Sequence, residues 1–281
     1  MPTVRDILNS ARDEIANAGI ESPRLTAELL LAEVLGCARS ELAAHGDVAV
    51  TDAQVARLEG FLQRRLRREP VDYIVGSREF YGRRFIVRPG VLIPRPETET
   101  IVEICKKRLP RDFAGVALDL GTGSGCLAVT LALEFARLRM IALDVSVDAL
   151  RVAAENAGAL KARVALVCSN WLAAIRRAPV ADLIVANPPY VDAADKPGMQ
   201  PEVRDFEPAV ALFGGEGGGT ATTRALLPEI RARLRNGGLA AVEFGAGQGA
   251  ELADAARAIG FTDVELARDL TGLERVLVLR P

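Results

Sequence analysis

The sequence predicts an α/β fold, in which a mostly parallel sheet follows a helical region and a β-hairpin. From Val116 onward, short apolar runs alternate with segments of helical periodicity, as in parallel sheets that have helices on both faces. Before that point, residues 3–68 have helical periodicity, and residues 71–96 have the alternation and turn signals of strands. We therefore expect a helical domain over 1–70, a hairpin linker over 71–96 and an α/β domain over 97–281.

Composition and charge limit the possible functions. The 281 residues are 49% hydrophobic and 26% charged, which is typical of a globular protein with a full core. A net charge of -2 gives no general attraction to nucleic acid or membranes, so we expect neither as a direct partner. The sequence starts without an apolar signal region and has no apolar stretch long enough to span a bilayer. We expect a cytoplasmic monomer.

Histidine and cysteine are too sparse for several common kinds of active site. His45 is the only histidine and lies at an expected helix end, where histidine is favoured without a catalytic role. Cys37, Cys105, Cys126 and Cys168 form no Cys-x-x-Cys pair and are typical of small core residues in a reducing compartment. The sequence therefore disfavours a Ser-His-Asp hydrolase, and we expect no metal site.

The helical region predicts three helices with clear start signals. Thr3 is a candidate N-cap of the first helix, and Ser22 followed by proline opens the second. Thr51 and Gln54 have the spacing of a capping box and open the third, which ends in four arginines within residues 64–68. Such a cluster suits a solvated helix end, while a contact with ribosomal RNA or an acidic protein stays open.

Strand-like runs fill the linker, and strands alternate with helices after it. The runs in the linker are residues 73–75, 80–82, 83–88 and 91–93, and a helix over 100–109 follows. The expected strands are residues 116–120, 140–145, 164–168, 183–187, 239–244, 264–267 and 275–279, and the expected helices are 124–136, 147–157, 222–234 and 249–259. The last two strands are too close in sequence for a crossover helix, so they pair antiparallel or lie apart. Residues 191–219 lack periodicity, which in a segment of this length indicates a binding loop or lid.

A glycine-rich turn follows the first strand of the α/β domain. It is Asp119-Leu-Gly-Thr-Gly-Ser-Gly125, and its glycines allow a tight turn and a close approach of the backbone to a ligand. A dinucleotide site would need a glycine where Cys126 stands. The spacing Asp-x-Gly-x-Gly-x-Gly is instead that of S-adenosylmethionine sites, and Asp119 suits the ammonium group of that cofactor.

Two further candidates follow the second and third strands. Asp144 ends the second strand, where its carboxylate can accept hydrogen bonds from both ribose hydroxyls of the cofactor. It could instead cap the next helix, although Ser146 can do so equally well. Trp171, the only tryptophan, packs either on the adenine ring or in the core. The sequence leaves both alternatives open.

The fourth strand ends in Asn187-Pro188-Pro189-Tyr190. Two consecutive prolines cannot donate to a sheet ladder, so the strand stops there. The simplest interpretation is a Pro-Pro turn beside a surface asparagine. However, the carboxyl ends of the first and fourth strands lie at one edge of the sheet, where open α/β sheets bind ligands.

This arrangement suits methyl transfer to a planar nitrogen. The lone pair of an amide or exocyclic amine is delocalised, so the nitrogen is a poor nucleophile. The Asn187 side-chain oxygen and the Pro188 carbonyl can accept its two hydrogens, and Tyr190 can lie against the planar group. No strong base is needed, because a sulfonium is already an activated methyl donor.

These motifs, together with others along the chain, resemble one family. The glycine turn combined with Asn-Pro-Pro-Tyr is similar to class I amino-group methyltransferases, which include DNA adenine enzymes. Other stretches resemble the release factor glutamine methyltransferases, the HemK/PrmC family, and the resemblance runs from the N-terminal helices to the last strand. These stretches are Phe80-Tyr-Gly-x-x-Phe85, Val91-Leu-Ile-Pro-Arg-Pro-Glu-Thr-Glu99, Phe206-Glu-Pro-Ala209 and Arg268-Asp-Leu-x-Gly272.

The resemblance implies a fold and a reaction. The fold is a Rossmann-like class I methyltransferase domain with a seven-stranded, mostly parallel sheet. The methyl donor is S-adenosyl-L-methionine, which leaves S-adenosyl-L-homocysteine. The acceptor is the side-chain amide of the glutamine in the Gly-Gly-Gln motif of bacterial-type class I peptide chain release factors, a modification that tunes translation termination. The helical domain and hairpin would hold the rest of the release factor.

The resemblance also implies the site residues. Asn187, Pro188 and Tyr190 are catalytic, and together with Pro189 they bind the glutamine. The implied cofactor-binding residues are Asp119, Gly121, Thr122, Gly123, Ser124, Gly125, Asp144, Trp171 and Asn187.

Two stretches depart from the family pattern, and two other functions stay open. Asn170 stands where an aspartate often precedes the tryptophan, and Glu216-Gly-Gly-Gly-Thr220 replaces an Asp-Gly-Leu sequence, which affects loop contacts rather than the reaction. An adenine-N6 DNA or RNA methyltransferase could use the same acceptors. A non-catalytic module that binds release factors or the ribosome could have retained the fold.

Overall fold

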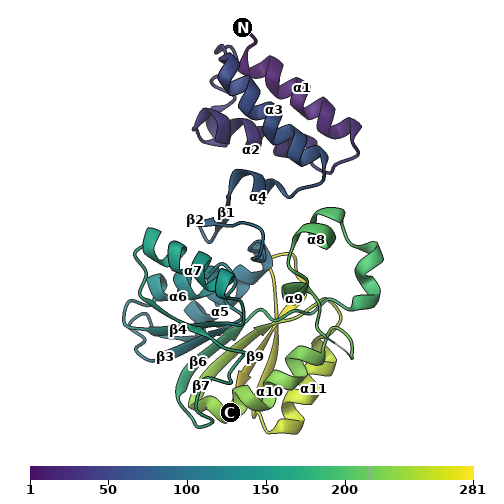
Figure 1. The fold of residues 1–281 in the computed structure, drawn as a ribbon. Coiled ribbons are helices and arrows are strands. Elements are labelled where there is room, and N and C mark those ends of the chain that lie inside the picture. The colour runs from purple at the N-terminus through teal and green to yellow at the C-terminus, as the bar shows by residue number, and fades with distance from the viewer. Residues whose placement is uncertain (216) are drawn as a thin grey trace. The chain divides into compact units, whose positions relative to one another are not determined.

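The chain forms two compact units in the computed structural model, which describes residues 1–215 and 217–281 (Figure 1). The smaller unit, called the helical unit below, consists of Met1–Ser77 and Gln200–Phe206. The larger unit, called the sheet unit, consists of Arg78–Met199 and Glu207–Pro281. A short segment that follows Asn-Pro-Pro-Tyr in the sequence therefore belongs to the helical unit.

The helical unit packs helices around an apolar core that includes Ile15, Leu30 and Leu31. Two of the expected caps are confirmed, because Thr3 and Thr51 each complete a capping box with the residue three positions later. Ser22 precedes α2 and Pro23 is its first residue, as expected, but Ser22 has a left-handed backbone with φ of 51° and its side chain makes no cap hydrogen bond. The helices are α1 (Val4–Asn17), α2 (Pro23–Leu35), α3 (Asp52–Leu66), α4 (Val71–Val75) and α8 (Pro201–Phe206).

The arginines at residues 64–68 are mostly paired within the helical unit. Arg64 donates two hydrogen bonds to the Glu69 carboxylate, and Arg65, which is buried, lies 2.9 Å from the Glu202 carboxylate. Arg68 donates to the carbonyl of Ala18 at the end of α1. The interpretation of this cluster as a solvated helix end is therefore wrong for Arg65, whereas Arg64 and Arg68 are paired but only half-buried.

Two runs in the linker differ from the expected strands. Residues 71–75 form α4, because the Pro70 carbonyl accepts from the amides of Tyr73 and Ile74 and both side chains are buried. Residues 91–93 join no strand, and the Ile93 amide donates to the Glu207 carboxylate at 3.1 Å. The hairpin itself is confirmed as β1 (Ser77–Phe80) and β2 (Arg83–Ile86).

All seven expected strands of the sheet unit are confirmed and form one sheet in the order β5-β4-β3-β6-β7-β9-β8. The pairs from β5 to β7 are parallel, whereas β9 pairs antiparallel with both β7 and β8. The expected antiparallel pairing of the last two strands is therefore confirmed. The strands are β3 (Val116–Leu120), β4 (Arg139–Asp144), β5 (Val164–Cys168), β6 (Ala181–Ala186), β7 (Leu234–Glu243), β8 (Asp263–Arg268) and β9 (Glu274–Arg280).

Helices cover both faces of this sheet (Figure 1). On one face α5 (Glu99–Arg108), α6 (Cys126–Glu134) and α7 (Val147–Ala159) pack over a core that includes Ile101 and Leu131. On the other, α10 (Ala221–Arg233) and α11 (Gly249–Ile259) pack over Leu227 and Leu252. Among residues 1–215 and 217–281, no helix combines the length and apolarity needed to cross a membrane.

The segment expected to be an irregular loop contains short helices. Besides α8 it includes a 3-10 helix, Ala193–Gly198, and α9 (Ala209–Leu212). Glu216, part of the glycine-rich departure from the family pattern, lies outside the described residues.

Candidate active site

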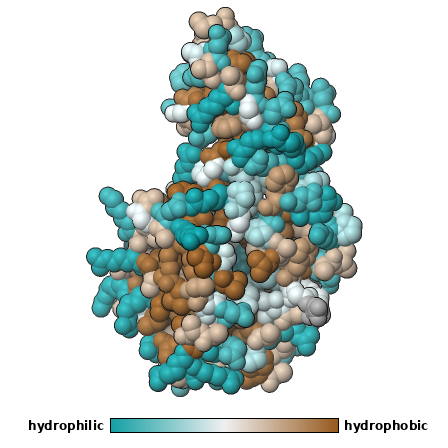
Figure 2. All heavy atoms as spheres, in the orientation of Figure 1, coloured by the Kyte–Doolittle hydropathy of each residue, from teal (hydrophilic) through white to brown (hydrophobic). Residues whose placement is uncertain are grey.

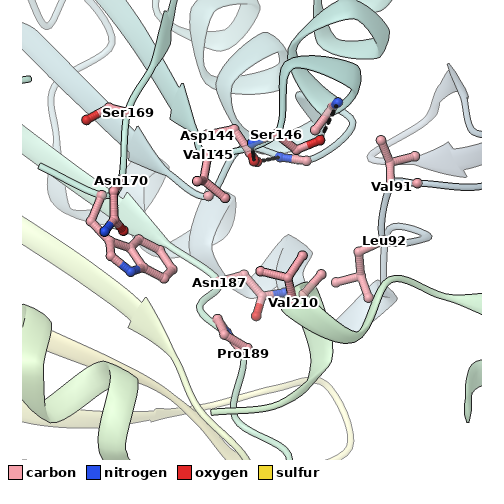
Figure 3. Close-up of a pocket in the computed structure, with 16 residues that line it drawn as sticks. Val91, Leu92, Asp144, Val145, Ser146, Ser169, Asn170, Asn187, Pro189 and Val210 are labelled. Atoms are coloured by element: carbon pink, nitrogen blue, oxygen red, sulfur yellow. Dashed lines mark hydrogen bonds between the residues drawn. The ribbon is translucent and has the colours of Figure 1, made fainter. Parts of the chain in front are cut away.

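A pocket of about 250 Å³ opens at the carboxyl ends of β3 to β6. Figure 3 shows Asp144 and Ser146 on one side of this pocket and Asn187 and Pro189 on the other. Val145 and Val210 also line it and are exposed. Figure 2 shows that apolar side chains reach the surface in several places in this view of the molecule. The structure therefore brings the glycine turn and the Asn-Pro-Pro-Tyr motif into one site.

The glycine turn is fixed against β4 and lies beneath a tryptophan. The amides of Gly121 and Thr122 both donate to the Leu143 carbonyl at 2.9 Å. Gly121 has φ of 71°, and a Cβ there would lie 3.2 Å from the Trp171 ring. Gly123 has φ of 56° and open space where a side chain would project. Glycine is therefore required at 121 both by the backbone conformation and by the contact with the ring.

Asp144 is held by two backbone amides. Its Oδ2 accepts from Gly123 at 2.9 Å, and its Oδ1 accepts from Ser146 at 2.8 Å. The cap of α7 is Ser146, whose hydroxyl accepts from the Ala149 amide. The alternative of Asp144 as helix cap is therefore excluded, and each carboxylate oxygen retains acceptor capacity toward the pocket.

Asp119 lies in a second, smaller pocket beside the first. Asp119 is 1% exposed, and its carboxylate accepts from the Thr122 hydroxyl at 2.6 Å. Burial raises the pKa of Asp119 to about 7, although hydrogen bonds from Thr122 and the Ala128 amide act in the opposite direction. Thr122, Ser124 and Asn187 also line this smaller pocket.

Three predicted site residues lie outside the lining of both pockets. Gly125 permits close packing on α7, since a Cβ there would lie 3.0 Å from Ala153. Pro188 is buried and Tyr190 is half-buried. Trp171 lines the larger pocket and also packs against the core under α10 and α11, so its contact with an adenine ring stays a prediction.

The orientation of the Asn187 amide is set by a threonine that the sequence did not indicate. The Asn187 Nδ2 donates to the Thr98 hydroxyl at 3.0 Å, and Thr98 is 2% exposed. Among the described residues, no hydrogen bond occupies the Asn187 side-chain oxygen. That oxygen is therefore available to accept a hydrogen bond from a ligand.

Tyr190 is held at both its hydroxyl and its backbone. Its hydroxyl donates to Glu243 Oε1 at 3.3 Å, and its carbonyl accepts from Gln248 Nε2 at 2.9 Å. Burial raises the pKa of Tyr190, and it also raises the pKa of Glu243 to about 7. The sequence signal for Glu243 is a carboxylate at the end of the apolar run that forms β7; it could equally indicate a structural ion pair, so we did not assign Glu243 to the site.

A buried carboxylate joins two of the family-like stretches. Glu207 accepts from the Ile93 amide at 3.1 Å and pairs with Arg95 at 2.5 Å. It therefore joins residues 91–99 to residues 206–209. Val91 and Leu92 of the first stretch line the larger pocket, and the second stretch is followed directly by Val210 and Ala211, which also line it. No group of metal-ligating side chains occurs within residues 1–215 and 217–281.

The fold and the site define the class of protein. A seven-stranded sheet with a glycine turn after its first strand and Asn-Pro-Pro-Tyr after its fourth is the architecture of a Rossmann-like class I methyltransferase. The family model described as the methyltransferase small domain matches residues 97–200.

Solved structures share this fold. A methyltransferase from Pyrococcus furiosus has a TM-score of 0.54 at 17% identity over 79% of this chain and 98% of its own. A 16S rRNA methyltransferase from T. thermophilus, in complex with AdoMet and guanosine, has a TM-score of 0.52 at 19% identity over 73% of this chain and 49% of its own.

Full-length relatives identify the family. The model described as the PrmC N-terminal domain matches residues 6–76. The release factor glutamine methyltransferase of Koribacter versatilis is 41% identical over 99% of this chain and 98% of its own length. That of Nitratidesulfovibrio vulgaris is 39% identical over 99% and 95%. The chain belongs to the release factor glutamine methyltransferase family.

Proposed function

We propose that this enzyme transfers a methyl group from S-adenosyl-L-methionine to the side-chain amide nitrogen of the glutamine in the Gly-Gly-Gln motif of peptide chain release factors. The observation that carries the proposal is the free acceptor oxygen of Asn187, which faces the same pocket as the glycine turn and Asp144. The names of the full-length relatives support release factors as the substrate.

The residues in the pocket suit the proposed cofactor. Asp144 offers a carboxylate for a ribose, Gly123 leaves open space beside it, and Trp171 offers an aromatic face. Asp119 supplies a carboxylate for the ammonium group in the smaller pocket. When bound, the sulfonium would supply an activated methyl group.

The protein's own contribution is positioning and desolvation. The Asn187 oxygen and the Pro188 carbonyl would accept the two hydrogens of the substrate amide and so fix the plane of its nitrogen. Tyr190 would contact the flat face of the amide. Val145 and Val210 are exposed at the pocket, so a bound substrate would contact them and water would be excluded from the site. We propose that the helical domain and the hairpin contact the rest of the release factor.

Transfer of a radiolabelled methyl group tests this proposal. The substrates are an unmethylated release factor, the same factor with the Gly-Gly-Gln glutamine changed to alanine, and duplex DNA. Label on the intact factor alone is the expected result. Label on DNA would establish the adenine alternative, and label on none of them would favour a non-catalytic module.

A further inference from the structure

The backbone of Tyr190 is held by one glutamine side chain. Gln248 lies in the turn between β7 and α11, and its Nε2 donates to the Tyr190 carbonyl at 2.9 Å. The oxygen of the same side-chain amide, Oε1, accepts from the Gly245 amide at 2.9 Å. A backbone N–H can only donate, so Gly245 fixes the oxygen of Gln248 on its own side and thereby directs the NH2 group at Tyr190.

A glycine from a third segment leaves room for this bond. A Cβ at position 219 would overlap the Tyr190 carbonyl oxygen and lie 2.5 Å from Gln248 Nε2, so any other residue would push the two groups apart. The backbone of Gly219 is not left-handed, so its own conformation does not require glycine. Glycine is therefore needed at 219 because of the contact between Gln248 and Tyr190.

Tyr190 is held a second time at the far end of its ring. Its hydroxyl donates to Glu243 Oε1 at 3.3 Å, and Glu243 is fully buried at the end of β7. The next residue is held as well, because the Val191 amide donates to the Leu212 carbonyl at 2.9 Å. With both its carbonyl and its hydroxyl bound, Tyr190 has a fixed place in the site although it is only half-buried.

The turn and the helix next to Gln248 do not explain its NH2 group. The turn uses the oxygen of the side chain, through the Gly245 amide, and a glutamate at 248 would accept from Gly245 equally well. Within the part of the chain that the structure describes, Gln248 makes no side-chain cap to α11, and its Nε2 donates to Tyr190 alone. The choice of an amide at 248 therefore concerns Tyr190.

We propose that Gln248 and Gly219 are positioning residues, which hold the backbone of Tyr190 so that its ring lies against the substrate amide. This inference rests on the proposed function, in which Tyr190 contacts the flat face of that amide. Both residues lie outside the lining of the two pockets, so they act through Tyr190 and not on the substrate. A misplacement of about 1 Å in an active site can lower the rate about 100-fold.

Substitution of Gln248 tests the proposal most directly. Gln248→Glu keeps the acceptor for the Gly245 amide, but its second oxygen repels the Tyr190 carbonyl instead of donating to it. We expect kcat with an unmethylated release factor to fall by about tenfold, while the Kd for S-adenosylmethionine and the melting temperature change little. An unchanged kcat, or a fall in melting temperature without a fall in kcat, would overturn the proposal.

Substitution of Gly219 tests the same bond from the other side. Gly219→Ala should lower kcat as much as Gln248→Glu does. The double variant should lose no more than either single variant, because all three lack the same bond. Gly198→Ala is the matched control, since it lies in the same segment after Asn-Pro-Pro-Tyr and has open space at its Cβ; it should leave kcat unchanged. Losses that multiply in the double variant would overturn the proposal.

A spectroscopic readout separates this inference from the proposed function. The chain has three tyrosines, so in NMR spectra of the protein with 13C-labelled tyrosine the Tyr190 resonances are assigned by their loss in Tyr190→Phe. They should shift in both Gln248→Glu and Gly219→Ala and stay unchanged in Gly198→Ala. Such shifts, with a wild type that does not methylate release factors, would place the failure in the proposed function. Unshifted Tyr190 resonances in Gln248→Glu and Gly219→Ala would contradict the inference whatever the enzyme methylates.

Discussion

At the scale of single residues, the site depends on a few polar side chains whose partners fix their orientation. Asp144 accepts from two backbone amides, and Asn187 donates to Thr98, so neither side chain can turn freely. Such preorganised acceptors stabilise a developing charge without reorganisation at the moment of reaction. Binding and turnover should therefore depend on different residues.

Asn187→Ala should abolish turnover while cofactor binding largely survives. The substitution removes the proposed acceptor for the substrate amide but leaves Asp144 and the glycine turn in place. Methyl transfer and calorimetric binding of S-adenosylmethionine, measured on one preparation, check this. Unchanged turnover would remove Asn187 from the mechanism.

Asp144→Ala should weaken cofactor binding by about 1.5–3 kcal/mol, the range for a hydrogen bond to a charged group. Asp148→Ala is the matched control, because Asp148 is exposed on α7 and pairs with the exposed Arg151. Calorimetric dissociation constants of both variants check the prediction. Equal affinities in the two variants would contradict a cofactor-binding role for Asp144.

The stability of the protein should depend on pH through Asp119. Burial raises the pKa of Asp119 to about 7 from an ordinary value of 3.8. Between these values the folded protein holds a proton that the unfolded chain has lost, so the free energy of unfolding falls as the pH rises. In Asp119→Asn the melting temperature should therefore fall less than in the wild type between pH 5 and pH 7. Parallel curves for the two proteins would show that Asp119 is ionised throughout this range.

At the scale of elements, the strands were predictable and several short segments were not. The strands are apolar runs bounded by polar residues, and this pattern is set locally. The prediction of a strand within residues 71–75 was wrong. β-Branched residues favour a strand there, whereas Pro70 and the buried Tyr73 and Ile74 favour one helical turn. Ser22 occupies the expected N-cap position, but its left-handed backbone is not the extended conformation in which a serine side chain caps a helix, and no cap hydrogen bond forms.

In the site, too, contiguous motifs were predictable and contacts between distant residues were not. The glycine turn and Asn-Pro-Pro-Tyr are contiguous motifs, so the sequence shows them directly. The bond from Asn187 to Thr98 joins residues 89 positions apart, and that from Tyr190 to Glu243 joins residues 53 apart. Such partners are set by the packing of α5 and β7 against β6, which no local pattern contains.

The conformation of the glycine turn predicts how substitutions of its glycines change stability. Gly121→Ala should cost about 1–2 kcal/mol of stability from its left-handed backbone, and it should also weaken cofactor binding by displacing Trp171. Gly158→Ala, in α7 with open space at its Cβ, should instead stabilise by about 0.5–1 kcal/mol. Chemical denaturation of both variants gives the comparison, and a neutral Gly121→Ala would contradict the assigned geometry.

At the scale of the whole molecule, the helical unit includes a segment from much later in the sequence, Gln200–Phe206. Glu202 on α8 pairs with Arg65 at 2.9 Å and with Arg68 at 3.4 Å, and Gln200 donates to Glu21 at 2.9 Å. This segment follows Asn-Pro-Pro-Tyr in the sequence and precedes Glu207. The chain therefore leaves the proposed substrate site, enters the helical unit and returns.

Glu202→Ala should destabilise the helical unit by about 3 kcal/mol, because it leaves the charge of Arg65 buried without its partner. Glu59→Ala, on the exposed side of α3, is the control. Hydrogen exchange of amides in α1 to α3 should accelerate in Glu202→Ala and not in Glu59→Ala. Equal exchange in both variants would mean that α8 adds nothing to the stability of this unit.

The pocket at Asn187 is proposed to direct a methyl group to one amide nitrogen. Tandem mass spectrometry of a release factor, taken before and after incubation with the enzyme and S-adenosylmethionine, tests this proposal. The expected result is the added mass of one methyl group on the Gly-Gly-Gln glutamine side chain, and no added mass when Asn187→Ala replaces the wild type. A methyl group on any other residue, or an unmodified factor, would contradict it.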